Sequence, residues 1–167
     1  MDGISKKAIA AGTNEEVFDL LGRELERRLP SRVDSGFVEA RRQLPVGLRA
    51  MAATYDLDVS LCLDDFGWHF GNWHDEHLAE ETALGLEELQ ATELAALFRN
   101  AFCLAKNYWV ELGSENWTDW YHGSELETAV MPLNDRAWEI LGERWNGIFS
   151  YWVEYAKRFP ERLDAHE

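Results

Sequence analysis

The segment from Asp56 to Glu88 constrains this chain more than any other, because it holds ten carboxylate side chains and no lysine or arginine. The ten are Asp56, Asp58, Asp64, Asp65, Asp75, Glu76, Glu80, Glu81, Glu87 and Glu88. The wider segment 50–135 contains 17 acids and two bases, so it carries essentially all of the net charge of −15. We expect these carboxylates to project outward together as one anionic field, which would attract a cationic partner and repel nucleic acid.

The apolar residues recur with helical spacing along most of the chain, and no alternating pattern is long enough to indicate a strand. Thr13 and Glu16 form a capping-box pair, which predicts a helix that starts at residue 13 or 14 and ends before Pro30. A length of 167 residues suits one domain of ordinary size. The sequence therefore predicts a single all-α domain over residues 1–167, a helical bundle of about six to eight helices.

The same pattern places the later helices. They are expected at about residues 35–43, 45–63, 75–90, 92–112 and 134–159. Gly67 and Gly71 should break or bend the chain between the second and third of these. Asn134 should cap the last helix, in which Trp138, Trp145 and Trp152 recur every seven residues and predict a core seam.

Nothing in the sequence indicates export or membrane insertion. Residues 1–12 lack the apolar core of a signal peptide, and no apolar run approaches the ~20 residues that a membrane helix needs. We therefore expect a cytoplasmic protein with reduced thiols. Cys62 and Cys103 fall in apolar helical patterns, as do Tyr55, Val59 and Leu63, so we expect these side chains to be buried.

The spacing of the acids favours a binding surface. Glu76 and Glu80 are like charges one helical turn apart, and Glu81 and Glu88 extend the row by two turns. A solvated face usually interleaves lysine or arginine at this spacing, which stabilises by about 0.2–0.5 kcal/mol per pair. Carboxylates one turn apart lie ~5–6 Å from each other, and phosphates repeat on a similar scale along DNA. Two interpretations stay open: a face that is only solvated, and a surface that presents to a basic protein what a duplex presents.

Chemistry at a metal ion is a further alternative. His74, His77 and Glu81 are spaced i, i+3 and i+7 on one expected helix, and His69 precedes them. Imidazole and carboxylate can bind zinc or iron, although the zincin and di-iron sequence motifs are absent. The chain also lacks nucleophile-elbow glycines, phosphate-binding glycine loops and a basic stripe for nucleic acid. The sequence thus predicts no enzyme activity, no cofactor, and no direct contact with nucleic acid or membrane.

Three blocks of sequence resemble a known family. Leu44-Pro45-Val46-Gly47-Leu48 leads into a helix that holds Tyr55 and Asp58. Residues 64–72 are similar to a family block of two asparagines, two glycines and a phenylalanine, with aspartate for both asparagines and Phe66 for the first glycine. Residues 133–138 and 155–160 are similar to its ending, so the resemblance covers about 44–163. The family is that of small acidic bacterial DNA-mimic proteins. It implies an all-α fold, acidic side chains that occupy the DNA-binding surface of a transcription factor, and dimeric assembly.

The leading hypothesis is a non-enzymatic acidic protein that mimics duplex DNA before a basic DNA-binding protein, with the ten carboxylates in place of phosphates. Its association should weaken as salt rises. An immunity or antitoxin protein against a basic nuclease toxin would use the same face, so the sequence does not separate the two. A metal-dependent enzyme built on His69, His74, His77 and Glu81 is the third hypothesis.

Overall fold

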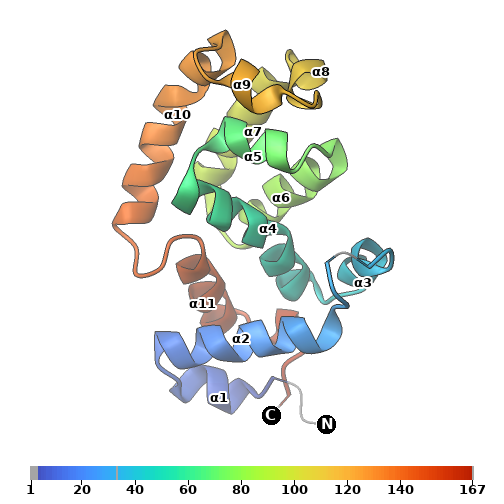
Figure 1. Ribbon diagram of the computed structural model, residues 1–167. Coiled ribbons are helices and arrows are strands. Elements are labelled where there is room, and N and C mark those ends of the chain that lie inside the picture. Colours follow the sequence, from blue (N-terminus) through green and yellow to red (C-terminus); the bar gives the residue numbers. More distant parts are fainter. Residues whose placement is uncertain (1–3, 33, 167) are drawn as a thin grey trace.

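The computed structural model describes residues 4–32 and 34–166 (Figure 1). Within these ranges the chain is helical and contains no strand, and a single β-bridge joins Ser5 to His166. The described helices are α1 (Lys6–Ala11), α2 (Asn14–Arg28), α3 (Phe37–Arg42), α4 (Val46–Leu63), α5 (Phe66–Asn72), α6 (Glu76–Glu88), α7 (Thr92–Lys106), α8 (Trp109–Leu112), α9 (Trp117–Tyr121), α10 (Glu125–Gly142), α11 (Phe149–Arg158) and the 3-10 helix η1 (Pro160–Leu163). The all-α prediction is confirmed, and there are more helices than expected because several are very short.

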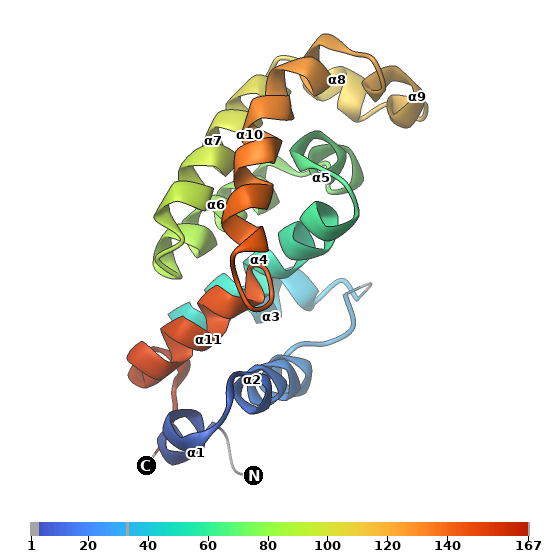
Figure 2. The ribbon, with the colours of Figure 1, turned by 90° about the vertical axis from the view of Figure 1, so that its left-hand side faces the viewer.

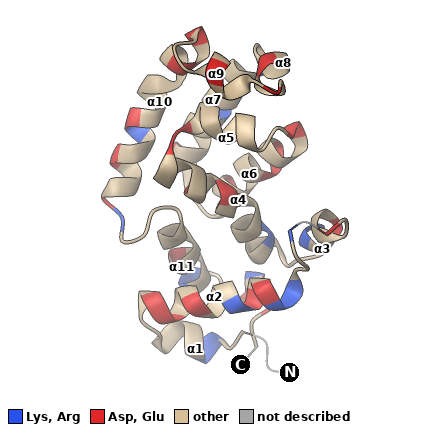
Figure 3. Ribbon diagram, in the orientation of Figure 1, with Lys and Arg blue, Asp and Glu red and all other residues tan. Residues whose placement is uncertain are grey.

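The two ends of the molecule differ in charge. Helices α1, α2 and α11 lie at one end together with both chain termini, and α8 and α9 lie at the other (Figure 1). Between them, α10 runs alongside α7 (Figure 2). Helices α1, α2, α3 and α11 carry lysines and arginines, which are interleaved with acids on α2, whereas α8, α9 and the first turn of α10 carry acids without bases (Figure 3). No helix of the described ranges is both long and apolar enough to cross a bilayer.

The predicted helix starts at α2 and α6 are confirmed by their caps. The Glu16 N–H donates to the Thr13 hydroxyl at 3.2 Å, and the Glu16 carboxylate accepts from the Thr13 N–H at 2.8 Å. At α6, the Asp75 carboxylate accepts from the N–H groups of His77 and Leu78 at 2.8 and 3.2 Å. Each cap satisfies donors that the first turn of a helix leaves free, so these signals are local to the sequence.

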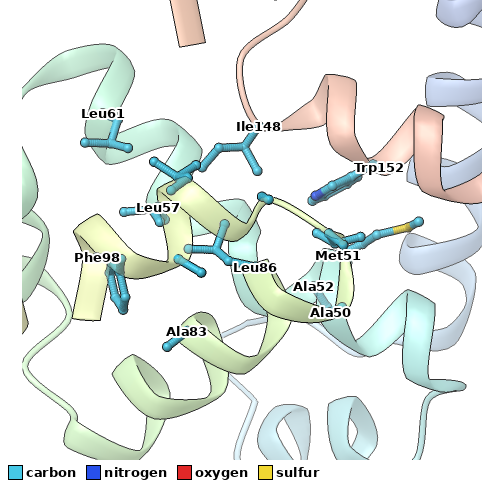
Figure 4. Packing of buried hydrophobic residues seen from close by; sticks show 14 of the residues in the cluster. Ala50, Met51, Ala52, Leu57, Leu61, Ala83, Leu86, Phe98, Ile148 and Trp152 are labelled. Atoms are coloured by element: carbon cyan, nitrogen blue, oxygen red, sulfur yellow. The ribbon is translucent and has the colours of Figure 1, made fainter. Parts of the chain in front are cut away.

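Helix α4 runs through the centre of the core and is buried on nearly every side. It packs against α6 on one side and against α2 and α11 on the other. Small residues bring α6 close, because a Cβ on Gly85 would lie only 3.0 Å from the Ala50 carbonyl oxygen. Met51 and Leu57 are fully buried there, and Trp152 of α11 closes the other side (Figure 4).

The apolar pattern expected for α4 matches its buried face only in part, because Leu48, Met51 and Ala52 are buried but its later members are not. Tyr55, Val59 and Leu63 are exposed, Leu63 at 80%, while Asp56 and Asp58 point into the molecule. A helix covered on several sides has no single apolar stripe, so its polar positions cannot be read as its outer face. The expectation for the thiols is wrong as well, because Cys62 and Cys103 are both exposed.

Gly67 and Gly71 lie inside α5. The expectation that they break the chain is therefore wrong. Their missing side chains let α9 rest directly on the backbone of α5. A Cβ on Gly67 would overlap the Tyr121 ring, and one on Gly71 would overlap the Trp117 ring. The glycines therefore serve close packing of two helices rather than a turn.

The two last expected helices are each divided in two. The chain leaves α7 at Lys106 and begins α8 at Trp109, and α7 begins without a side-chain cap. Asn134 does not cap a helix but lies buried within α10, where it accepts a hydrogen bond from the Phe66 N–H at 3.1 Å. The turn at Gly147 then separates α10 from α11.

This turn also removes the predicted tryptophan seam. Trp152 lies in the core, but Trp138 and Trp145 are partly exposed. The three residues stand on one face only if the helix is continuous, and the turn over residues 143–148, which contains Gly147 (φ +50°), ends that continuity. Pro160 follows the last α-helix and opens η1.

Candidate protein-binding surface

Three of the ten predicted partner-binding carboxylates are buried. Asp56, Asp58 and Asp65 are 6%, 5% and 8% exposed. Asp56 pairs with Arg32, Asp58 accepts from the Ile148 N–H at 2.8 Å, and Asp65 caps α5. Each carboxylate is used inside the fold, so these three cannot stand in for phosphates, and this part of the prediction is corrected.

Burial controls the ionisation of these groups. It raises the pKa of the Asp56 carboxyl above its usual value, and the neighbouring Arg32 guanidinium offsets part of that rise. Burial also raises the pKa of Asp58, against the opposing effect of the hydrogen bond from Ile148. A desolvated carboxylate needs such partners to stay charged, which is why these aspartates lie where the fold supplies a cation or an N–H.

The predicted row on α6 is largely neutralised. Glu76 pairs with Lys106 at 3.1 Å, Glu87 with Arg99 at 2.8 Å, and Glu88 with Arg162 at 2.8 Å. Two arginines of α3 pair with Glu81. The lysine and arginines that pair with these carboxylates belong to α7, η1 and α3, and none belongs to α6 itself. The row is therefore an intramolecular ion-pair zone rather than a free anionic face.

Glu81 is the member of the row that two arginines of one helix hold. Its carboxylate pairs with the buried Arg41 and, at 3.1 Å, with Arg42. Both arginines belong to α3, so this contact fastens α3 to α6. Of the seven predicted carboxylates that are not buried, only those of Glu80, Asp75 and Asp64 have no lysine or arginine partner among the described residues, and Asp75 already caps its own helix.

A second set of acids lies at the α8–α9 end of the molecule. We call it the acidic end, and it comprises Asp64, Glu111, Glu115, Asp119, Glu125 and Glu127. Residues 107–135 contain no lysine or arginine. In the part of the chain that the structure describes, the one ion-pair contact of this set joins Glu127 to His122 at 3.5 Å. Figure 3 shows these acids on α8, α9 and the start of α10 with no base among them.

The folding of α8, α9 and α10 brings these acids together. Helix α9 packs on both α5 and α8, and the Tyr108 hydroxyl donates to Glu125 at 3.0 Å. Burial raises the pKa of the Asp64 carboxyl, and the charges of Asp65 and Glu127 raise it further, while His122 lowers it. The carboxylates thus form one repelling group, in which charge is not matched locally.

Aromatic and apolar side chains lie among these acids. Val110 is 84% exposed and Trp73 is partly exposed. Trp109 stacks on His74 at 4.3 Å between ring centroids, and Trp117 lies edge-on to Trp68 at 4.8 Å. Aromatic groups beside a charged rim are typical of protein-binding surfaces. The acidic end thus offers both parts of such a surface.

Sequence reasoning missed the acidic end, although a signal was present. Residues 107–135 lack bases as completely as 56–88 do. Its acids are spread over two short helices, a turn and the start of a third helix, so they show no regular four-residue row. Only their tertiary arrangement unites them.

Two of the three histidines proposed for a metal make other contacts, and the third, His77, is exposed on α6. His69 is buried beside Ser60, with its Nδ1 2.9 Å from the Ser60 hydroxyl, and burial lowers its pKa to about 3. His74 Nε2 lies 2.7 Å from the Trp109 carbonyl oxygen. Glu81 is held by α3, as described. Among the described residues, no group of three or more potential ligands is placed to hold a metal ion.

Comparison with known proteins places this arrangement in a family. The model for DMP19-like proteins matches residues 42–163, from the last residue of α3 to the last residue of η1. The chain belongs to the DMP19-like family. A search of curated proteins and a search of solved structures found no match.

The blocks that resemble the family hold the DMP19-like region together. Gly47 lies against Leu163 of η1, where a Cβ would come within 2.6 Å of a leucine methyl carbon. Asp65, in the block that resembles the family, caps α5 by accepting from the Trp68 N–H at 2.8 Å. Asparagine and aspartate both cap helices well, so an asparagine at this position would fill the same structural role.

Proposed function

We propose that this protein binds a basic DNA-binding protein and covers its DNA-contacting surface with the acidic end. Membership of the DMP19-like family, a family of DNA mimics, is the observation that carries the proposal. The unmatched carboxylates of Glu111, Glu115, Asp119 and Glu125 would stand in for phosphates, together with Asp64, whose carboxyl group interacts with Glu127.

Physical chemistry supports this surface over the α6 row. An ion-paired carboxylate must give up its own arginine before it attracts another, whereas an unmatched one gains a partner and relieves repulsion. Glu81 and Glu88 are in the first situation and Glu111 and Glu115 in the second. The binding energy for a basic partner is therefore larger at the acidic end.

The test is capture of partners from native lysate at low salt. The variant changes Glu111, Glu115 and Glu125 to glutamine and Asp119 to asparagine. The matched control changes four exposed acids elsewhere, namely Asp19→Asn, Asp34→Asn, Glu143→Gln and Glu161→Gln, and so alters net charge equally. We expect the acidic-end variant to lose a DNA-binding protein that the wild type and the control both retain.

A competition experiment then addresses the mimicry. The captured protein should release a labelled DNA duplex when this protein is added. Binding between the two proteins should weaken from 50 to 300 mM salt, because the Debye length shortens by roughly 2.4-fold over that range. Equal loss of capture in the variant and the control would contradict the proposal, as would a partner that holds duplex and this protein at once. Capture of a nuclease toxin would favour the immunity hypothesis instead.

A further inference from the structure

A groove of about 440 Å³ separates the N-terminal part of the chain from the DMP19-like region. We call the described residues before 42 the N-terminal arm. Phe18 and Leu29 of the arm form one wall of the groove, and Tyr55 and Trp152 of the matched region form the other. The volume falls in the range of ~300–1,000 Å³ that ligand sites occupy, so the two parts do not close fully on each other.

One side chain of the arm already enters this groove. Arg32 lies in the segment between α2 and α3, and its guanidinium carbon sits 4.3 Å over the Tyr55 ring and 5.7 Å from the Phe37 ring. The same guanidinium pairs with the Asp56 carboxylate. An aromatic face beside a carboxylate is the combination that binds a planar guanidinium group. The position of Arg32 therefore shows that the pocket binds a guanidinium group.

The pocket needs a cation to be stable. Asp56 is buried, burial raises its pKa, and Arg32 and Arg41 both act to lower it. A buried carboxylate that loses its partner is costly. Tyr55 and Asp56 belong to the region that the family match covers, whereas Arg32 lies before it. Receptor and occupant thus come from different parts of the chain.

The arm is not fastened equally well everywhere. Arg32 is partly exposed and outside any helix. Nearby, the Arg41 Nε is buried and has no hydrogen-bond partner within the described residues. An unsatisfied buried donor is unfavourable, so this part of the arm is held less firmly than the Arg41–Glu81 ion pair alone would hold it. The groove beside Arg32 also leaves space for the aliphatic part of a second side chain.

We propose that the pocket formed by Tyr55 and Asp56 is a receptor for an arginine side chain of a basic protein partner, which Arg32 occupies until the partner displaces it. The inference rests on the proposed function, because both require a basic partner. It adds a second contact, distinct from the acidic end, that recognises arginine by stacking rather than by charge alone.

The experiment uses the full chain and a capped hexa-arginine peptide as probe, at 150 mM salt. Arg32→Gln vacates the pocket, and Arg23→Gln is the matched control, since Arg23 is exposed on α2 with no ion pair in the described part of the chain. Because apparent affinity scales with the fraction of open sites, we expect Arg32→Gln to bind hexa-arginine about tenfold more tightly than wild type. Arg23→Gln should stay within about twofold, since it changes only net charge.

Two further measurements secure the interpretation. A capped hexa-lysine peptide should gain much less, because an ammonium group does not stack as a guanidinium does. The double variant Arg32→Gln with Asp56→Asn should lose the gain while its helical circular dichroism is unchanged. Arg32→Lys keeps a cation beside Asp56, so it can be measured even if Arg32→Gln does not fold. We expect its affinity for hexa-arginine to lie between those of the wild type and Arg32→Gln.

Equal gains in Arg32→Gln and Arg23→Gln would overturn the inference, as would a folded Arg32→Lys that binds hexa-arginine no better than wild type. These outcomes leave the proposed function standing if partner capture from lysate still depends on the acidic end. Conversely, the acidic-end variant should keep the Arg32→Gln gain even if no DNA-binding protein is captured. The two failures are therefore distinguishable.

Discussion

The hydroxyl oxygen of Tyr121 lies 2.9 Å from both carboxylate oxygens of Asp65. The tyrosine belongs to α9 and the aspartate caps α5, so this contact fastens two helices that are 56 positions apart in sequence. Both side chains are buried, and burial together with the nearby Asp65 charge raises the pKa of the tyrosine. The tyrosine stays protonated and donates to the carboxylate, which positions α9 and the acids it carries.

Removing this hydroxyl should destabilise the fold. Tyr121→Phe leaves the Asp65 carboxylate buried with one donor fewer, so we expect the free energy of unfolding to fall by about 1–3 kcal/mol. Tyr108→Phe is the control, because its hydroxyl donates to Glu125 at the surface, and we expect a loss below about 0.5 kcal/mol. Denaturant unfolding measures both. Equal losses would show that the buried contact has no special weight.

Two glycine-to-alanine changes should have opposite signs. Gly67→Ala places a methyl group into the Tyr121 ring, and overpacking of this kind costs about 1–3 kcal/mol or more. Gly22→Ala lies within α2 with nothing near its Cβ position, so the helix propensity of alanine should stabilise by about 0.5–1 kcal/mol. Thermal unfolding of both variants gives the signs directly, and a neutral Gly67→Ala would contradict the packing of α9 on α5.

Neighbouring glutamates of α6 should respond very differently to loss of charge. Glu81→Gln leaves the buried Arg41 without its carboxylate partner, which we expect to cost about 3 kcal/mol. Glu80→Gln alters an exposed residue with no ion pair within residues 4–32 and 34–166, so its effect should stay within about 0.5 kcal/mol. Urea unfolding compares the two. Similar small effects would mean that the α3–α6 contact contributes little.

His69 should make stability depend on pH below neutrality. Burial lowers its pKa from the ordinary 6.5 to about 3. Between these values the unfolded chain binds a proton that the folded protein does not, so unfolding becomes easier as pH falls, by about 1.4 kcal/mol per pH unit. From pH 7.5 to pH 5 this histidine should cost about 2 kcal/mol.

The variant His69→Gln isolates that contribution. Asp56 and Asp58 have raised pKa values and act in the opposite direction, since protonation favours their folded state. Both proteins share these aspartates, and only the wild type has His69. The difference in unfolding free energy between wild type and His69→Gln should therefore shrink as pH falls. His77→Gln, at an exposed position, should follow the wild type throughout. A difference that is constant with pH would refute the assignment.

Local signals in the sequence were sufficient for parts of the fold. The capping pair at Thr13 and Glu16 and the acids at the start of α6 place two helices almost to the residue. Such signals act within one helical turn, so they do not depend on the rest of the molecule. The helical class follows from apolar spacing in the same way.

Tertiary contacts decide what the sequence could not show. The α10–α11 turn depends on Gly147, where a Cβ would lie 2.6 Å from a carboxylate oxygen of Asp58 in α4. The charges of α6 are matched by arginines 12 to 74 positions away, such as Arg99 for Glu87 and Arg162 for Glu88. A row that lacks neighbouring bases in sequence can still be neutral in space. Conversely, acids that are scattered in sequence gather at the α8–α9 end.

The pairing of residues 4–6 with His166 has a practical consequence. The Lys6 N–H donates to the His166 carbonyl oxygen at 2.8 Å, and the His166 N–H donates to Ile4 at 3.0 Å. Because residues 4–6 and His166 are neighbours, a short linker could connect these two backbone segments. New termini could then be opened elsewhere, as circular permutation requires. Because this junction and α8–α9 occupy opposite poles (Figure 1), a sensor chip coupled here would leave the anionic pole facing the flowing solution.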